Sequence, residues 1–123
     1  MSNLDSLTTI KNNHDFDTTF TNEYDENQTA VTLITPTSGK SLKITGVYIS
    51  TEGATTIGQK IRLYFATSDD TVATIIPAAV SNQASSMVVS PIIVRGAIDE
   101  TLKITSNLGS GKNYFICINY KQE

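Results

Sequence analysis

Apolar residues in this chain recur at every second position over short stretches, which is the pattern of half-buried β-strands. In residues 60–67, KIRLYFAT, the side chains of Ile61, Leu63 and Phe65 share one face. Similar stretches, each bounded by Gly, Pro, Asn, Asp or Ser, predict about eight strands and no convincing helix. The predicted strands cover residues 16–20, 30–35, 41–50, 60–67, 71–76, 87–94, 102–105 and 114–120.

The tetrapeptide LKIT occurs twice, at 42–45 and 102–105. In both copies the alternation predicts Leu and Ile facing inward and Lys and Thr facing outward. The residues that follow the two copies do not align, so we interpret the repeat as convergent strand patterning and not as a duplication. After the first copy, Val47 and Ile49 change parity across Gly46, which predicts a β-bulge there.

Two further breaks in the pattern carry structural information. The run MVVSPIIV (87–94) is apolar on both faces, as in a central strand, but it contains Pro91. Proline lacks an N–H donor, so we expect an edge position or a bulge at this point. The segment SDDT (68–71) predicts a tight turn that joins residues 60–67 and 71–76 as a hairpin.

This series of short strands with frequent turns favours an all-β, two-sheet antiparallel sandwich, and the strand number favours an eight-stranded jelly roll. An immunoglobulin-like sandwich is the alternative, but such domains usually contain a core Trp and this chain has none. The composition agrees with a β-fold, because 14 Ile, 7 Val and 18 Thr make it rich in β-branched residues. We expect a polar acidic N-terminal arm at residues 1–24 and a single sandwich domain at residues 25–123.

The net charge of −3 is unevenly distributed along the chain. Residues 1–29 carry six acids and one base, whereas the rest of the chain has a small positive excess. Nucleic-acid binding requires clustered Lys and Arg, so this balance argues against it. The acidic leader is either a solvated segment or an arm that reaches a basic surface on a partner. No apolar run approaches the roughly 18 residues of a membrane span, and we expect no membrane partner.

Two polar motifs resemble known binding sites but lack the required residues. The segment TSGKS (37–41) ends like a phosphate-binding loop, but Ile34 occupies the position of the first glycine and a strand follows instead of a helix. In NNHDFD, His14 lies beside Asp15 and Asp17, with no second His or Cys to complete a metal site. We interpret the first motif as a turn and the second as a solvated acidic segment.

The stretch NEYDENQT (22–29) resembles a calcium loop only vaguely, because the spacing, the central glycine and the closing Glu do not match. We keep a weak cation-binding site in this stretch as an alternative interpretation. Five scattered tyrosines leave sugar binding open as well, although sugar platforms favour Trp.

Nothing in the chain predicts an enzyme. Cys117 is the single cysteine and lies in the apolar run NYFICINY, where we expect a buried thiol in the strand core. The single histidine lies in the arm, so no Ser–His or Cys–His pair is available. The neighbouring acids, Asp69 with Asp70 and Asp99 with Glu100, are expected to form turns. We therefore expect no catalytic, cofactor-binding or metal-binding residues.

Several stretches of this sequence resemble a known class of proteins. LKITGVYIST, IRLYFATSDDTVATI and VSPIIVRGAIDETLKITSN follow a polar arm. Together they resemble small jelly-roll structural proteins of tailed bacteriophage particles, such as capsid decoration proteins, head fibres and tail-tip domains. The resemblance covers residues 30–123 and lies in the overall character of the sequence, which is rich in Thr, Ile and Asn, without a diagnostic motif. It implies a non-enzymatic building block, commonly trimeric, that is attached to a larger lattice.

From the resemblance we expect a virion structural protein that decorates or cements a capsid. It would be a homo-oligomer, with a trimer favoured, bound to other virion proteins such as the major capsid or tail protein. Its location would be the virion, after synthesis in the cytoplasm of a host bacterium. Surplus apolar residues in PIIV and YFICINY independently indicate a surface that other subunits cover. The alternatives are a receptor- or glycan-binding module at a phage tail or fibre tip, with loops 51–59 and 107–113 at its distal end, and a sugar-binding domain of a larger bacterial protein.

Overall fold

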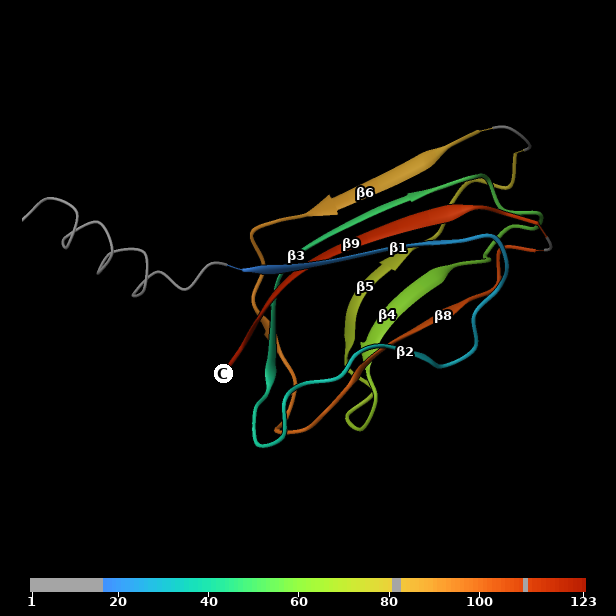
Figure 1. The fold of residues 1–123 in the computed structure, drawn as a ribbon. Helices are drawn as coiled ribbons and strands as arrows, with labels where there is room; N and C mark the ends of the chain where they lie inside the picture. Colours follow the sequence, from blue (N-terminus) through green and yellow to red (C-terminus); the bar gives the residue numbers. More distant parts are fainter. Residues whose placement is uncertain (1–16, 81–82, 110) are drawn as a thin grey trace, which may run out of the picture.

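The computed structural model describes residues 17–80, 83–109 and 111–123, and these form nine β-strands in two antiparallel sheets. The sheets pack face to face, so the protein is an all-β sandwich as the sequence predicts (Figure 1). The strands are β1 (Thr18–Tyr24), β2 (Val31–Ile34), β3 (Leu42–Thr51), β4 (Ile61–Phe65), β5 (Thr71–Ile75), β6 (Ser85–Val89), β7 (Val94–Arg95), β8 (Leu102–Ser106) and β9 (Tyr114–Gln122).

The strand order is that of a jelly roll. The larger sheet runs β1–β9–β3–β6, with β7 also paired to β3, and the smaller sheet runs β2–β8–β4–β5. Strands β6 and β7 pair with consecutive parts of β3, so they form one interrupted edge strand. Counted in this way there are eight strands, and every connection crosses between the sheets except the β4–β5 hairpin. This connectivity confirms the predicted eight-stranded jelly roll.

The two LKIT segments form parts of β3 and β8, which lie in opposite sheets. Leu42 and Ile44 from β3, and Leu102 and Ile104 from β8, are all fully buried. Full burial of one such side chain stabilises the fold by about 1.5–3 kcal/mol. The repeat therefore arises because each sheet contributes one strand of the same pattern to the shared core.

The predicted bulge in β3 is confirmed at Gly46. The register with β9 pairs Ile44 with Tyr120 and then Gly46 with Asn119, so one residue of β3 is left over. A Cβ atom on Gly46 would lie 3.2 Å from the hydroxyl oxygen of Ser90, closer than most such contacts. The bulge reverses the parity of the strand and returns the following apolar residues to the core.

The run 87–94 is an edge segment, and its apolar residues on both faces do not mark a central strand. Strand β6 ends before Pro91 and lies at the edge of the larger sheet, which confirms the position inferred from the proline. The Ile92 N–H donates to the Thr45 carbonyl oxygen (3.0 Å) and holds the break against β3. Ile93 is 66% exposed, so the second apolar face of this run is directed to solvent.

Within the described residues the first strand of the sandwich starts at Thr18, so residues 18–24 of the expected arm lie in the larger sheet. Strand β1 pairs with β9 in unbroken register over seven residues, from Thr18 with Tyr120 to Tyr24 with Tyr114. Phe20 and Tyr24 pack against the core and hold the strand in place. The sequence predicted a strand at residues 16–20 and so identified the first half of β1, but the polar residues that follow led us to interpret 22–24 as part of a loop. Residues 1–16 of the expected arm lie outside the described residues.

Candidate functional site

The connections β1–β2, β3–β4, β5–β6 and β8–β9 leave the strands at one end of the sandwich, which we call the loop end (Figure 1). The Thr55 N–H donates to the Leu108 carbonyl oxygen (3.1 Å) and joins the β3–β4 loop to the β8–β9 loop. Loops 51–59 and 107–113 therefore lie together, as the sequence analysis expected.

An open cleft of about 730 Å³ lies at the loop end, where β1 and β3 finish and β9 begins. No Lys, Arg or His is among its lining residues in the described part of the chain. Such a surface disfavours anionic ligands and offers hydrogen-bond acceptors beside apolar rings. The lining includes three carboxylates and three aromatic rings: Glu23, Asp25, Glu52, Tyr24, Tyr114 and Phe115.

Two of the aromatic rings form a fixed pair. The rings of Tyr24 and Tyr114 are stacked with centroids 5.1 Å apart, and the Tyr114 hydroxyl lies 2.7 Å from the buried Ser106 hydroxyl. Burial raises the pKa of Tyr114 to about 12, with the Ser106 hydrogen bond acting in the opposite direction and the nearby Tyr24 and Glu26 adding to the rise. The phenol therefore stays neutral at physiological pH and its role is structural.

Glu52 is already committed to a contact within the protein. Its carboxylate accepts a hydrogen bond from the backbone N–H of Asn113 (3.1 Å) and lies 3.5 Å from the side-chain amide of the same residue. Glu23 and Asp25 remain exposed on the other side of the cleft. Within the described ranges, no three His, Cys, Asp or Glu side chains are grouped to hold a metal ion.

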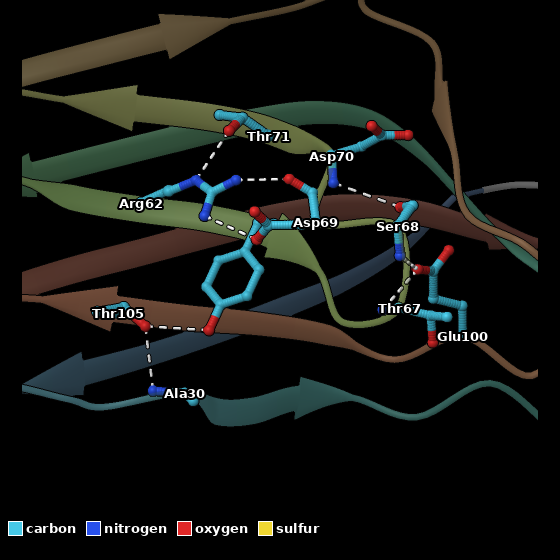
Figure 2. Close-up of polar contacts among 10 residues, drawn as sticks. Ala30, Arg62, Thr67, Ser68, Asp69, Asp70, Thr71, Glu100 and Thr105 are labelled. Atoms are coloured by element: carbon cyan, nitrogen blue, oxygen red, sulfur yellow. Dashed lines mark hydrogen bonds and ion pairs between the residues drawn. The ribbon is translucent and has the colours of Figure 1, made fainter.

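A second polar cluster, on the outer face of the smaller sheet, closes the β4–β5 hairpin (Figure 2). The Arg62 guanidinium donates to Thr71 Oγ1 (2.8 Å), Asp69 Oδ1 (3.0 Å) and the Asp69 carbonyl oxygen (2.6 Å), and it lies 4.5 Å above the Tyr64 ring. The Tyr64 hydroxyl is in turn 3.1 Å from Thr105 Oγ1. These contacts use three of the five N–H donors of Arg62 and fix the side chain in place, so the cluster stabilises the hairpin.

Glu100 is a buried carboxylate that joins two turns. Although it is only 3% exposed, it accepts hydrogen bonds from the backbone N–H groups of Thr67 (2.8 Å), Ser68 (2.6 Å) and Ala97 (2.8 Å) (Figure 2 shows the first two residues). Burial acts to raise the pKa of Glu100, but these hydrogen bonds outweigh it and the pKa lies below its usual value. The carboxylate is a structural clamp, in agreement with the turn-forming role expected for this acid.

The TSGKS segment forms a turn, as expected. The Lys40 N–H donates to the Thr37 carbonyl oxygen (2.9 Å), and Gly39 has a φ of 84°, in the left-handed region that glycine adopts readily. The Gly39 N–H donates to the Asp99 carboxylate (2.7 Å), and β3 follows directly. No helix is present here to direct amides at a phosphate.

The outer face of the larger sheet carries an apolar row. The register places Val88 of β6, Tyr48 of β3 and Cys117 of β9 side by side, with Phe115 next to Tyr48 at a ring separation of 6.2 Å. Val88 is 66% exposed and Tyr48 is 37% exposed. The expectation that Cys117 is buried in the core is wrong: β9 turns Ile116 to the core, so the cysteine is half-buried on the outer face.

Apolar residues at the loop end were missed by the sequence reasoning. Ile57 is 89% exposed, and Ile76 and Val80 are also exposed. The Ala54 N–H donates to the Ala78 carbonyl oxygen (2.9 Å), which brings the β5–β6 connection beside the β3–β4 loop. Apolar residues within loop segments were the available signal, because loop residues lie at the surface.

Of the residues that the sequence analysis considered as a metal site and interpreted as a solvated acidic segment, His14 and Asp15 lie outside the described residues. Asp17 lies at the start of β1, where it accepts a hydrogen bond from the Thr45 hydroxyl and forms an ion pair with Lys121 (3.7 Å). Its visible role is to fix the beginning of the strand. The described residues also include no helix of the length and apolarity that crossing a membrane requires.

No protein-family model and no curated protein matches this chain. Among solved structures, it is similar to a subunit of Bacillus endospore appendages, a family of disulfide-linked pili. The two sequences are 14% identical, the match covers 85% of this chain and 86% of that chain, and the TM-score is 0.43. It is also similar to the carbohydrate-binding module CBM6cm-2 of Cellvibrio mixtus lichenase 5A, solved with cellotriose, with 17% identity, coverage of 86% and 92%, and a TM-score of 0.35. Neither is described as a phage protein, and likenesses this remote carry no functional argument.

Proposed function

We propose that this protein is a non-enzymatic structural subunit that works as an oligomer within a larger particle. The observation that carries the proposal is the apolar row of Val88, Tyr48 and Cys117, with Phe115 beside it, on the outer face of the larger sheet. An outward-facing sheet surface is normally polar, and exposed apolar surface of this kind is typically covered by another subunit.

The particle we propose is a tailed-phage virion, with the protein as a capsid-decorating or cementing component. The support for this role is the resemblance of residues 30–123 to small virion jelly-roll proteins. The acidic leader adds support, because a polar segment beside a compact domain can strengthen attachment by tethering.

Particle attachment tests this proposal directly. Purified virions from the source phage, analysed by mass spectrometry, are expected to contain the protein at tens to hundreds of copies. The Val88→Lys variant places a charge in the apolar row. It is expected to bind particles from which the native protein has been removed much more weakly than the wild type does. Thr32→Lys, on the exposed outer face of the smaller sheet, is the matched control and should bind normally. A protein that is missing from virions and turns over a small substrate would overturn the proposal.

A second candidate function is receptor or glycan binding at a phage tail or fibre tip. The observation that favours it is the loop-end cleft, where exposed carboxylates lie beside aromatic rings and no base is present among the described lining residues. Carboxylates accept hydrogen bonds from sugar hydroxyls, and rings stack against sugar faces. Glycan-array binding by the wild type that is lost in Phe115→Ala and kept in Val88→Lys would support this function over the first.

A further inference from the structure

Oligomerisation, on which this inference rests, requires a contact between copies, and the edges of the two sheets are the natural place to look for it. An edge strand presents unpaired N–H and C=O groups, and proteins usually protect such edges with prolines, bulges, short strands or charges. Two edges belong to the larger sheet, β1 and the β6–β7 pair, and two to the smaller sheet, β2 and β5.

Three of these four edges carry a protecting feature. The β6–β7 edge is interrupted at Pro91. Strand β2 has four residues, with a register shift between Thr32 and Ile34. Strand β5 has five residues and pairs with a register shift between Leu63 and Tyr64 of β4. Each feature breaks the regular spacing that a second strand would need for pairing.

Strand β1 has no proline, bulge or shortening of this kind, and Glu23 is its single charge. It runs through seven residues in unbroken register with β9, and its sequence TTFTNEY contains no Pro, no Gly and one charge. Thr, Phe and Tyr favour the extended conformation. Among the described residues, no strand lies on the open side of β1.

The hydrogen-bond pattern shows which backbone groups face the open side. At the two ends of β9, Asn113 and Glu123 bond to the backbone of the β3 side, at Glu52 and Ser41 respectively. Backbone groups alternate in direction along a strand, so the odd-numbered residues of β9 face β3 and the even-numbered residues face β1. The even-numbered residues of β1 lie opposite the even-numbered residues of β9, and their backbone N–H and C=O groups bond to that strand.

The odd-numbered residues of β1 therefore direct their N–H and C=O groups away from the sheet. These residues are Thr19, Thr21 and Glu23. In agreement, the Glu23 N–H bonds to the neighbouring Asn22 side chain (2.9 Å), a contact that lies within β1 itself.

We propose that β1 pairs antiparallel with β1 of a second copy, about a two-fold axis that passes beside Thr21. In this register Thr21 faces Thr21 of the second copy, and Thr19 faces Glu23 of the second copy. This register pairs all seven residues of β1 with those of the second copy, whereas the alternative two-fold register centred on Phe20 would pair only residues 18–22 of the strand.

This register also extends the apolar row. Thr21 lies opposite Cys117 on β9, which is beside Tyr48 and Val88. Pairing at Thr21 aligns this row with the same row of the second copy, so one continuous outer face spans both subunits. The edge contact would thus double the surface that the proposed function assigns to particle binding.

Two seven-residue strands bury less than the roughly 800 Å² per partner of a standard interface, so we expect a weak dimer with a Kd on the order of 100 µM. Each copy carries a net charge of −3, so added salt should screen the repulsion and strengthen pairing. When many copies lie on one particle, their high local concentration makes such a weak contact effective.

Sedimentation analysis of the whole chain at concentrations up to about 1 mM, with substitutions at Thr21, tests the pairing. Thr21→Pro removes an outward N–H from the centre of the contact in both copies but leaves the β1–β9 bonds intact, so dimer affinity should fall by about thirtyfold or more. Thr21→Val keeps the N–H and the extended conformation and should dimerise like the wild type. A Thr21→Pro variant that unfolds would be recognised by circular dichroism, and the cross-linking experiment would then decide.

Cross-linking provides a second readout. In a Cys117→Ser background, Thr21→Cys should give a covalent dimer on mild oxidation, because opposed residues in an antiparallel pair lie within disulfide range. Thr32→Cys, at the β2 edge in the same background, should stay largely uncross-linked. A wild-type monomer at 1 mM, or a trimer that Thr21→Pro leaves unchanged, would overturn the pairing. If that protein still binds particles, the proposed function stands and only this contact is wrong.

Discussion

At the scale of single residues, the polar groups of this protein are used mainly to hold turns. Glu100 accepts three backbone hydrogen bonds from two separate segments, although it is almost completely buried. A buried carboxylate is tolerated only when its oxygens are satisfied in this way. The acids that appeared as neighbours in the sequence therefore have different tasks, and the burial of Glu100 separates it from the exposed Asp99.

Replacing Glu100 with Gln tests this clamp. The amide group of Gln has one acceptor oxygen and one donor nitrogen, so at least one of the backbone N–H groups of Thr67, Ser68 and Ala97 would face a donor. We expect the free energy of unfolding to fall by about 2–3 kcal/mol, measured by urea denaturation. Asp70→Asn, at an exposed turn position, is the control and should change stability by less than about 0.5 kcal/mol.

The same clamp predicts a pH dependence. The pKa of Glu100 is lower in the folded chain than its ordinary value of 4.5, so folding favours the ionised form. Its stabilisation is fully present above the ordinary pKa and is lost as the pH falls through the lower, folded value. The stability difference between the wild type and Glu100→Gln should therefore shrink below about pH 4. A difference that stays constant from pH 7 to pH 3 would contradict the ionised clamp.

At the scale of strands, the sequence predicts which residues share a face and where a strand breaks, but it does not show which face of an apolar strand meets the second sheet. The alternation in LKIT and the parity change at Gly46 are local, so both were predictable, as was the break at Pro91. The inner or outer placement of Cys117 depends on which face of β9 meets the second sheet, and its run is apolar on both faces. The loop-end cleft joins three strands that are distant in sequence, so no single segment indicated it.

Two glycines near the larger sheet allow a comparison of local packing. A Cβ on Gly96 would lie 2.6 Å from a ring carbon of the fully buried Phe65, whereas one on Gly46 would meet the side-chain ends of Ser90 and Asn119 at 3.2–3.3 Å. We expect Gly96→Ala to cost about 2–3 kcal/mol and Gly46→Ala about 1 kcal/mol or less in unfolding free energy. If chemical denaturation gave the same loss of unfolding free energy for both variants, the Phe65 ring would have moved to make room for the added methyl group without cost.

At the scale of the whole molecule, β1 determines how much of the chain can be removed. It contributes Phe20 and Tyr24 to the core and covers one side of β9, whereas residues 1–16 precede the described sandwich. Deletion of residues 1–16 should leave the unfolding free energy within about 1 kcal/mol of the wild type. Deletion of residues 1–24 should cost about 3 kcal/mol or more and expose β9 to aggregation. Thermal unfolding followed by circular dichroism distinguishes the two outcomes, and equal stability of both truncations would mean that β1 is dispensable.

The position of β9 has a consequence for synthesis on the ribosome. This late strand lies between β1 and β3, and its contact between Asn119 and Thr19 joins residues 100 positions apart. A nascent chain therefore holds β1 and β3 without their shared neighbour until residues 114–122 have emerged. Structures dominated by such distant contacts fold slowly, over milliseconds to seconds. During that interval the unprotected β1 can meet the same strand on a neighbouring nascent chain. Translation from an mRNA that carries many ribosomes would therefore favour pairing between β1 strands before either chain has folded.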